Sequence, residues 1–197
     1  MEEETFSRTY LDKLCRVASE IDISVVEDVA KHLKNVRSNR GRLFVLGVGG
    51  SAANASHLVN DFRKLAGIES YAPTDNVSEL TARTNDDGWN SFFTEWLKLS
   101  NLSSNDCILI LSVGGGNREL NISTGLCDAV DLAISKKISI IGIVGRNDGY
   151  VAQKASFVIL VPPIFSDLVT PLSESFQAII WHLLVSHPNL KINNTKW

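Results

Sequence analysis

The sequence has no long apolar segment and no excess of positive charge. Its longest strongly apolar run, Ile138 to Val144, falls far short of the roughly 20 residues that cross a bilayer. The first residues, MEEETFSRTY, are acidic and lack the basic start and apolar stretch of a signal peptide. A net charge of -3 indicates no basic face for nucleic acid. These absences predict a cytoplasmic protein with neither a membrane nor a nucleic-acid partner.

Cysteine is also scarce, with three residues at Cys15, Cys107 and Cys127. An odd number at wide spacing fits neither a disulfide framework nor a CxxC metal site. Cys107 lies in an apolar run, and we expect it to behave as a small buried hydrophobic residue. The cysteine pattern therefore predicts a reducing compartment.

Short apolar runs alternate along the chain with segments of helical spacing. Unbroken apolar runs are typical of strands buried on both faces, and their alternation with helices predicts a parallel, doubly wound α/β sheet. We expect Ser24 to cap the second of two helices before the first strand. The expected strands are 42–47, one ending at 71–73, 107–112, 138–144 and 157–161, and the expected helices lie within 5–38 and at 51–66, 78–82, 89–99, 120–136 and 172–186.

Two glycine-rich loops follow predicted strands. The first is Gly47–Ser51, and the second is Ser112–Asn117. Glycines let the backbone approach an anion closely, and the N-terminus of a following helix offers free N–H groups. Either loop alone is equally explained as a tight turn, but two at the carboxyl ends of strands indicate the ligand crevice of an open α/β sheet. A third polar segment, Thr84–Gly88, is either a helix cap or a loop in which Asn85 and Asp86 hold sugar hydroxyls.

Two pairs of ligand-type side chains occur at helical spacing. His57 and Asp61 are four residues apart in the helix expected at 51–66, so they share a face. Glu174 and His182 are eight apart, about two turns, on an otherwise apolar helix. Imidazole and carboxylate groups are good ligands for zinc and similar ions. Each pair is also a common surface arrangement, and spacing alone does not show that the two helices meet.

Four motifs, in order along the chain, resemble the sugar isomerase (SIS) domain proteins and, among them, the phosphoheptose isomerase family. They are GVGGSAANASHLVNDF, SVGGGN, IGIVGRNDG and ESFQAIIWHLLVSHP. The resemblance implies a flavodoxin-like, doubly wound five-stranded parallel sheet, with a helical arm at 1–40 and an SIS domain at 41–190. It also implies a homotetramer with active sites at subunit contacts. We expect the polar segment 191–197 to form a loose C-terminal tail.

Carried over by position, the resemblance implies a sugar-phosphate site beside a zinc ion. The implied substrate-binding residues are Gly50, Ser51, Asn85, Asp86, Ser112, Gly114, Gly115, Gly116 and Asn117. The implied metal ligands are His57, Asp61, Glu174 and His182, and the last three are also the implied catalytic residues.

Some of these positions differ from the family pattern. Asp61 stands where many relatives have glutamate, so its reach is one methylene shorter. Glu174 replaces a common glutamine and adds a negative charge, which favours a divalent cation. Val113 and Gly114 replace frequent hydroxyl residues, so phosphate contact there would use backbone N–H groups. Val48 stands where many relatives have asparagine.

The resulting hypothesis is an aldose–ketose isomerase that converts sedoheptulose 7-phosphate to D-glycero-D-manno-heptose 7-phosphate through an enediol. His182 with Asp61 or Glu174 would move the protons, and zinc or a similar divalent cation would stabilise the oxyanion. One alternative is a non-catalytic module that binds phosphosugars or assembles with another protein. Another is an isomerase of a different phosphosugar. The presence of both histidines and both carboxylates favours an enzyme.

Overall fold

The structure, a computed structural model, describes residues 5–195 of the chain. Within them, five parallel strands form one sheet in the order β2-β1-β3-β4-β5. This order confirms the expected flavodoxin-like, doubly wound α/β fold. The strands are β1 (Leu43–Leu46), β2 (Ser70–Tyr71), β3 (Cys107–Ser112), β4 (Ser139–Val144) and β5 (Phe157–Leu160).

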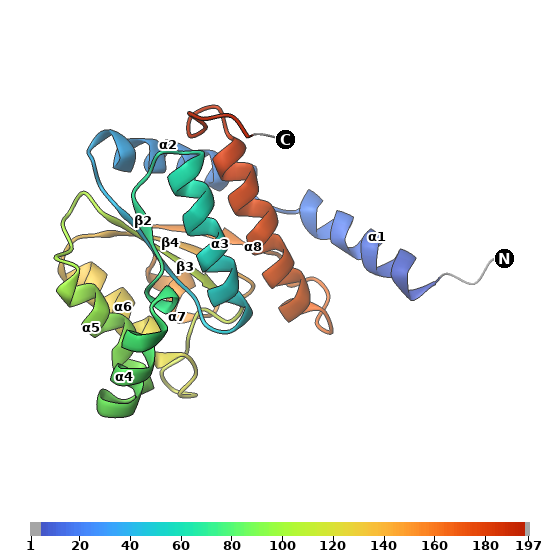
Figure 1. Cartoon of the computed structure of the whole chain (residues 1–197). Helices are drawn as coiled ribbons and strands as arrows, with labels where there is room; N and C mark the ends of the chain where they lie inside the picture. The colour runs from blue at the N-terminus through green and yellow to red at the C-terminus, as the bar shows by residue number, and fades with distance from the viewer. Residues whose placement is uncertain (1–4, 196–197) are drawn as a thin grey trace.

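Helices cover both faces of the sheet (Figure 1). Alternate residues of each central strand enter opposite cores: Leu109 of β3 packs into the core under α2, α3 and α8, and Ile110 into the core under α5, α6 and α7. The strands read as unbroken apolar runs because both faces are buried. The helices are α1 (Phe6–Ser19), α2 (Ile23–Ser38), α3 (Gly50–Lys64), α4 (Val77–Asp87), α5 (Phe92–Leu99), α6 (Thr124–Ser135), α7 (Tyr150–Lys154) and α8 (Val169–Ser186), with short 3-10 helices at η1 (Pro73–Asp75) and η2 (Trp89–Ser91).

Helix α1 projects away from the body, as Figure 1 shows. Val17 is its one buried residue. Lys13 joins α1 to the segment before α8 through an ion pair of 3.4 Å with Asp167 and a position 5.0 Å above the ring of Phe165. The exposed remainder of α1 is therefore available for contacts outside the chain's own core.

Several expected boundaries are wrong. Asp22, not Ser24, caps α2, since the Asp22 carboxylate accepts the backbone N–H of Ser24 at 2.9 Å. The segment from Thr84, expected as a helix cap or a polar loop, is the last turn of α4, which ends at Asp87 and has Gly88, with a φ of 83°, as its C-cap. Helix α7 was not expected, because five residues are too few for a periodic pattern. Among the residues that the structure describes, no helix is long and apolar enough to cross a membrane.

Candidate active site

His57, Asp61 and His182 meet where α3 packs alongside α8 (Figure 1). The Nε2 atoms of His57 and His182 each lie 3.5 Å from the same carboxylate oxygen, Oδ2 of Asp61. One ligand atom from each residue falls within 4.8 Å of the other two. The structure thus brings together three of the four expected metal ligands, from two helices more than 100 residues apart in sequence.

Asp61 is the fixed centre of this trio. Its side chain is 11% exposed, whereas the two imidazole side chains are 55% and 51% exposed. A buried carboxylate needs hydrogen-bond donors to offset its lost hydration. Asn60 donates its amide N–H to Oδ1 at 3.0 Å, and the indole of Trp181 donates to Oδ2 at 3.2 Å. Both oxygens are therefore held, while the two imidazoles remain open to a ligand.

The backbone determines the tautomer of His182. Its Nδ1 lies 2.7 Å from the carbonyl oxygen of Ala178, which can only accept a hydrogen bond. Nδ1 must therefore carry the proton, and in the neutral ring Nε2 presents a lone pair to Asp61 Oδ2. Two facing acceptors require a proton or a cation between them. Two imidazole nitrogens and a carboxylate oxygen form a common catalytic zinc set, so the residues present fit this metal.

Glu174 lies outside the trio. It is about 12 Å from His182 along the axis of α8, since each residue of a helix rises 1.5 Å. Its carboxylate instead lies over the first turn of α3, where both oxygens are 2.7 Å from the position that a Cβ on Gly50 would take. A negative group is favoured there by the helix dipole. A single chain thus places Glu174 at the first glycine loop rather than at the imidazoles.

Ser51 lies in the first turn of α3, within a buried polar network. The amide N–H of Asn54 donates to the carbonyl oxygen of Glu174 and to Oε1 of Gln177, both at 2.9 Å. Because a carbonyl must accept, Asn54 must donate, which leaves the Gln177 Nε2 to donate to Ser51 Oγ at 3.0 Å. The Ser51 hydroxyl proton therefore points away from Gln177. Sequence reasoning missed Gln177, because an isolated amide on an apolar helix carries no local signal.

The second glycine loop, Ser112–Asn117, is stabilised by a hydrogen bond to the hydroxyl of its first residue. Ser112 Oγ, at the end of β3, accepts the N–H of Gly115 at 3.0 Å. Gly115 and Gly116 have φ values of 72° and 80°, which a side chain would strain. A cavity of 280 Å³ opens beside this loop. Its lining includes Gly114, Gly116, Asn117 and the exposed Arg146 that follows β4.

Arg146 was not predicted as a site residue. Its position in the motif IGIVGRNDG, directly after a predicted strand, could have indicated it, because the carboxyl ends of parallel strands meet at one edge of the sheet. Its guanidinium supplies a positive charge beside a loop expected to bind phosphate.

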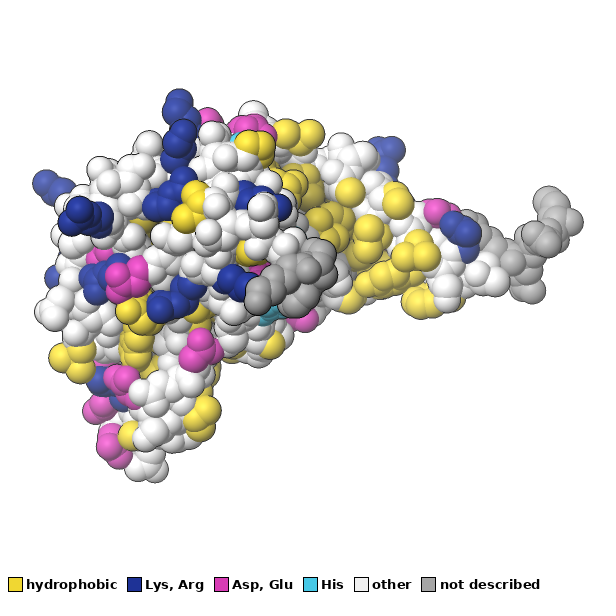
Figure 2. Space-filling model, turned by 45° about the horizontal axis from the view of Figure 1, so that its top comes forward, with side chains coloured by type: hydrophobic (Ala, Val, Ile, Leu, Met, Phe, Trp, Pro, Cys, Tyr) yellow, Lys and Arg dark blue, Asp and Glu magenta, His cyan; other side chains and the backbone are white. Residues whose placement is uncertain are grey.

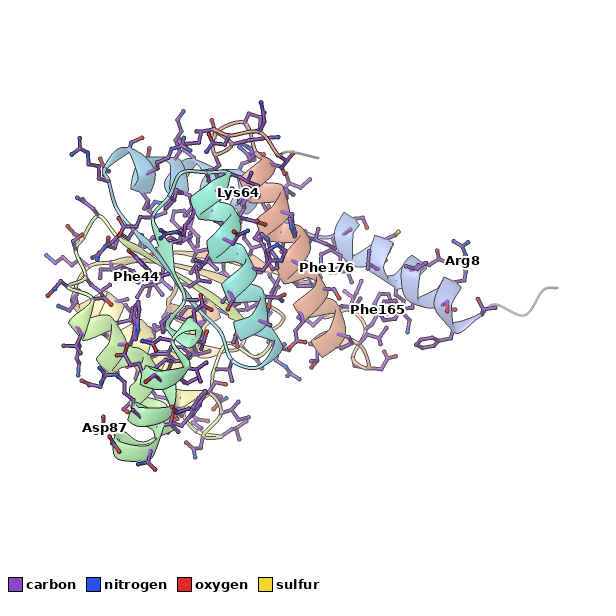
Figure 3. All side chains as sticks on the ribbon, in the orientation of Figure 1. Arg8, Phe44, Lys64, Asp87, Phe165 and Phe176 are labelled. Atoms are coloured by element: carbon purple, nitrogen blue, oxygen red, sulfur yellow. The ribbon has the colours of Figure 1, made fainter. Side chains whose placement is uncertain are left out.

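Asn85 and Asp86 lie far from the trio within one chain. They sit in the last turn of α4, beside Asp87, which Figure 3 shows at the projecting end of that helix. Both are exposed, and the amide of Asn85 donates to the carboxylate of Asp86 at 2.8 Å. A substrate bound at the trio would meet these residues only if another subunit supplied them.

Residues 8–145 of the chain match the sequence family described as SIS domain. The chain belongs to the SIS domain family. The match includes both glycine loops, His57 and Asp61, whereas Glu174 and His182 lie beyond it. The resemblance read from the motifs is thereby confirmed.

Individual SIS domain proteins resemble the chain over most of its length. The phosphoheptose isomerase of Aquifex aeolicus is 32% identical over 162 residues, which are 76% of this chain and 81% of that protein. The phosphoheptose isomerase of Aneurinibacillus thermoaerophilus is 27% identical over 173 residues, which are 85% of this chain and 82% of that one. The structure of phosphoheptose isomerase from Neisseria gonorrhoeae superimposes on this chain with a TM-score of 0.77 and 22% sequence identity. The superposition covers 90% of this chain and 94% of that one. That likeness shows the shared fold.

Proposed function

We propose that this SIS domain protein is an aldose–ketose isomerase that converts sedoheptulose 7-phosphate to D-glycero-D-manno-heptose 7-phosphate, the first step toward activated heptose. Relatives named phosphoheptose isomerase support the substrate class. The observation that carries the proposal is the convergence of His57, Asp61 and His182 around one oxygen atom.

The proton transfers follow from the different exposure of the trio. Isomerisation moves a proton between C1 and C2 and another between their oxygens. The His182 ring is half exposed and its Nε2 faces Oδ2 of Asp61, so this nitrogen can exchange a proton with a bound sugar when no cation occupies it. Asp61 is buried behind it and stabilises the imidazolium that forms. Glu174 is the second candidate carboxylate. In a single chain it lies over the first glycine loop, so it would reach the reacting carbons only from another copy of the chain.

The phosphate would bind at the carboxyl ends of β1 and β3. Gly50 and Ser51 contribute first-turn N–H groups and a hydroxyl at the start of α3, where the helix dipole favours an anion, and the Glu174 carboxylate that lies over this turn would move aside for the phosphate. The loop Ser112–Asn117, specifically Ser112, Gly114, Gly115, Gly116 and Asn117, would supply the second set of contacts. Binding the phosphate at one end orients the reacting carbons at the other.

Zinc, or a similar divalent cation, is the proposed cofactor. His57, Asp61 and His182 would hold it, because their ligand atoms already lie within 4.8 Å of one another. Glu174 would join as a fourth ligand only in an assembly that brings another copy of it to the trio. A bound cation supplies Lewis-acid stabilisation of the developing oxyanion.

A homotetramer is the proposed assembly. Figure 2 shows apolar side chains gathered along the projecting arm and where it meets the body. Phe6 and Leu11 of α1 are 77% and 53% exposed, a large apolar surface for a helix outside the core. A neighbouring subunit covering this surface could also bring Asn85 and Asp86 to the sugar hydroxyls.

The remaining proposals concern organisation and location. We assign residues 1–40 to an assembly arm, 41–190 to the catalytic SIS domain and 191–197 to a tail. We place the protein in the cytoplasm, without a membrane or nucleic-acid partner. The free cysteines Cys15, Cys107 and Cys127 support a reducing compartment.

The direct test is to incubate the purified protein and zinc with sedoheptulose 7-phosphate and to follow the product by NMR. We expect the aldose heptose 7-phosphate to form, and His182→Asn to abolish its formation. Asp28→Asn, an exposed carboxylate on α2, is the control that should leave the rate unchanged. Saturable binding of the phosphosugar without turnover would contradict the enzyme and support a sugar-phosphate sensor.

A further inference from the structure

Trp181 contacts all three members of the trio. It precedes His182 on α8, is 1% exposed, and donates its indole N–H to Oδ2 of Asp61 at 3.2 Å. Its ring centroid lies 5.2 Å from that of His57, in an edge-on arrangement, and 4.9 Å from that of His182. A buried indole thus forms a wall behind both imidazoles while its single polar atom holds the carboxylate between them.

The hydrogen-bond chemistry of indole suits this position. Its N–H can donate but cannot accept or bind a metal, so Trp181 cannot compete with the imidazoles for a cation. Oδ1 of Asp61 is already taken by Asn60. The oxygen held by Trp181 is therefore the one that both histidine Nε2 atoms approach at 3.5 Å. Without the indole N–H, the carboxylate could turn about its Cβ–Cγ bond and move that oxygen away.

We propose that Trp181 is a positioning residue that fixes Oδ2 of Asp61, and the faces of His57 and His182, in the arrangement that binds a divalent cation. The inference rests on the proposed zinc site but not on the identity of the sugar. Partners that hydrogen-bond a metal ligand typically contribute 10–100-fold to metal affinity or activity. We expect an effect of that size from the loss of this one N–H group.

Trp181→Phe is the test variant, because it keeps an aromatic ring and removes the donor. Zinc affinity is measured by competition with a chromophoric chelator, without any sugar. We expect the Kd for zinc to rise 10–100-fold. The matched control is Phe176→Leu, labelled on α8 in Figure 3, which also trims a buried aromatic side chain of that helix but has no group that could hold Asp61.

Two further measurements separate positioning from packing. In the Asp61→Asn background, Trp181→Phe should change zinc affinity less than threefold, because the charged acceptor is already gone. The indole N–H resonance of Trp181 should shift in Asp61→Asn, while those of Trp89 and Trp96 remain in place. The resonance reports the hydrogen bond whether or not a metal or a sugar binds.

These measurements decide whether Trp181 positions the carboxylate of Asp61. Weaker zinc binding in Trp181→Phe than in Phe176→Leu, together with the resonance shift, supports it. A Kd equal to that of the control, a resonance indifferent to Asp61→Asn, or no zinc binding by the unaltered protein overturns it. If these results hold but sedoheptulose 7-phosphate is not isomerised, the positioning role stands and the proposed reaction fails.

Discussion

Replacing Asp61 with asparagine removes one charge from the trio with almost no change of shape. The side chain is buried, and both of its oxygens accept hydrogen bonds, from Asn60 and from Trp181. An asparagine retains one oxygen, so one of these donors must face an amide N–H. Trp181 is 1% exposed and cannot turn to water, whereas Asn60 is exposed. The retained oxygen should therefore face Trp181.

This arrangement determines how much stability and how much activity the Asp61→Asn variant should lose. Leaving a buried donor unpaired costs about 1–3 kcal/mol, but Asn60 can re-pair with water, so we expect the free energy of unfolding to fall by about 1 kcal/mol or less. The catalytic loss should be much larger. An acid–base group typically contributes about 10²–10⁴-fold, and the variant also loses the charge opposite both imidazoles. We expect kcat/KM to fall by about that factor, roughly 3–5 kcal/mol of transition-state stabilisation.

The assay compares kcat/KM, from NMR progress curves on sedoheptulose 7-phosphate, with the free energy of unfolding from urea titration. Asp28→Asn serves again as the control of equal charge change. A kcat/KM within threefold of the unaltered protein would refute the role given to Asp61. A loss of activity matched by extensive unfolding would show a structural role instead.

Three further outcomes follow from the structure. Gln177→Leu leaves the buried Ser51 hydroxyl without its amide donor, so the free energy of unfolding should fall by about 1–3 kcal/mol and KM for the phosphosugar should rise, measured by urea titration and kinetics. Burial lowers the pKa of His32 below 6.5. The stability that neutral His32 contributes is therefore present above its pKa in the unfolded state and is lost as the pH falls through its pKa in the folded state. His32→Phe should flatten the decline in the free energy of unfolding below about pH 6.5, measured by urea titration. Burial alone would raise the pKa of Asp106, but hydrogen bonds from Arg42 and from the backbone outweigh it and hold the pKa below 3.8. The stability that Asp106 adds is thus present above that value and lost as the pH falls further, so Asp106→Asn should be less stable at neutral pH and show a smaller loss in acid, measured by circular dichroism.

The sheet could be predicted from sequence because each strand is a short apolar run with both faces buried. The run Cys107–Ser112 was predicted with its observed boundaries. Local polarity misled the prediction at Thr84–Gly88, where α4 continues through asparagine and aspartate until glycine ends it. A lone cap was misplaced at Ser24 because aspartate two residues earlier offers a better acceptor to the same helix.

The site was predictable only where its members share a helix. The spacing of His57 and Asp61 placed both on one face of α3, but no local pattern shows that α3 lies beside α8. For Glu174 and His182, the same side of one helix still means a separation of about 12 Å. The apolar pattern around Trp181 predicts only a buried core residue. Its hydrogen bond to Asp61 depends entirely on tertiary packing.

Deuterium uptake during turnover tests the central claim most directly, because it reports whether a side chain carries the proton between carbons. The His182 side chain is 51% exposed, so a proton held there exchanges with solvent. We predict that the product formed from sedoheptulose 7-phosphate in heavy water carries deuterium at C2, and that His182→Asn forms neither labelled nor unlabelled product. Product without deuterium, or labelled product from His182→Asn at the unaltered rate, would contradict the account.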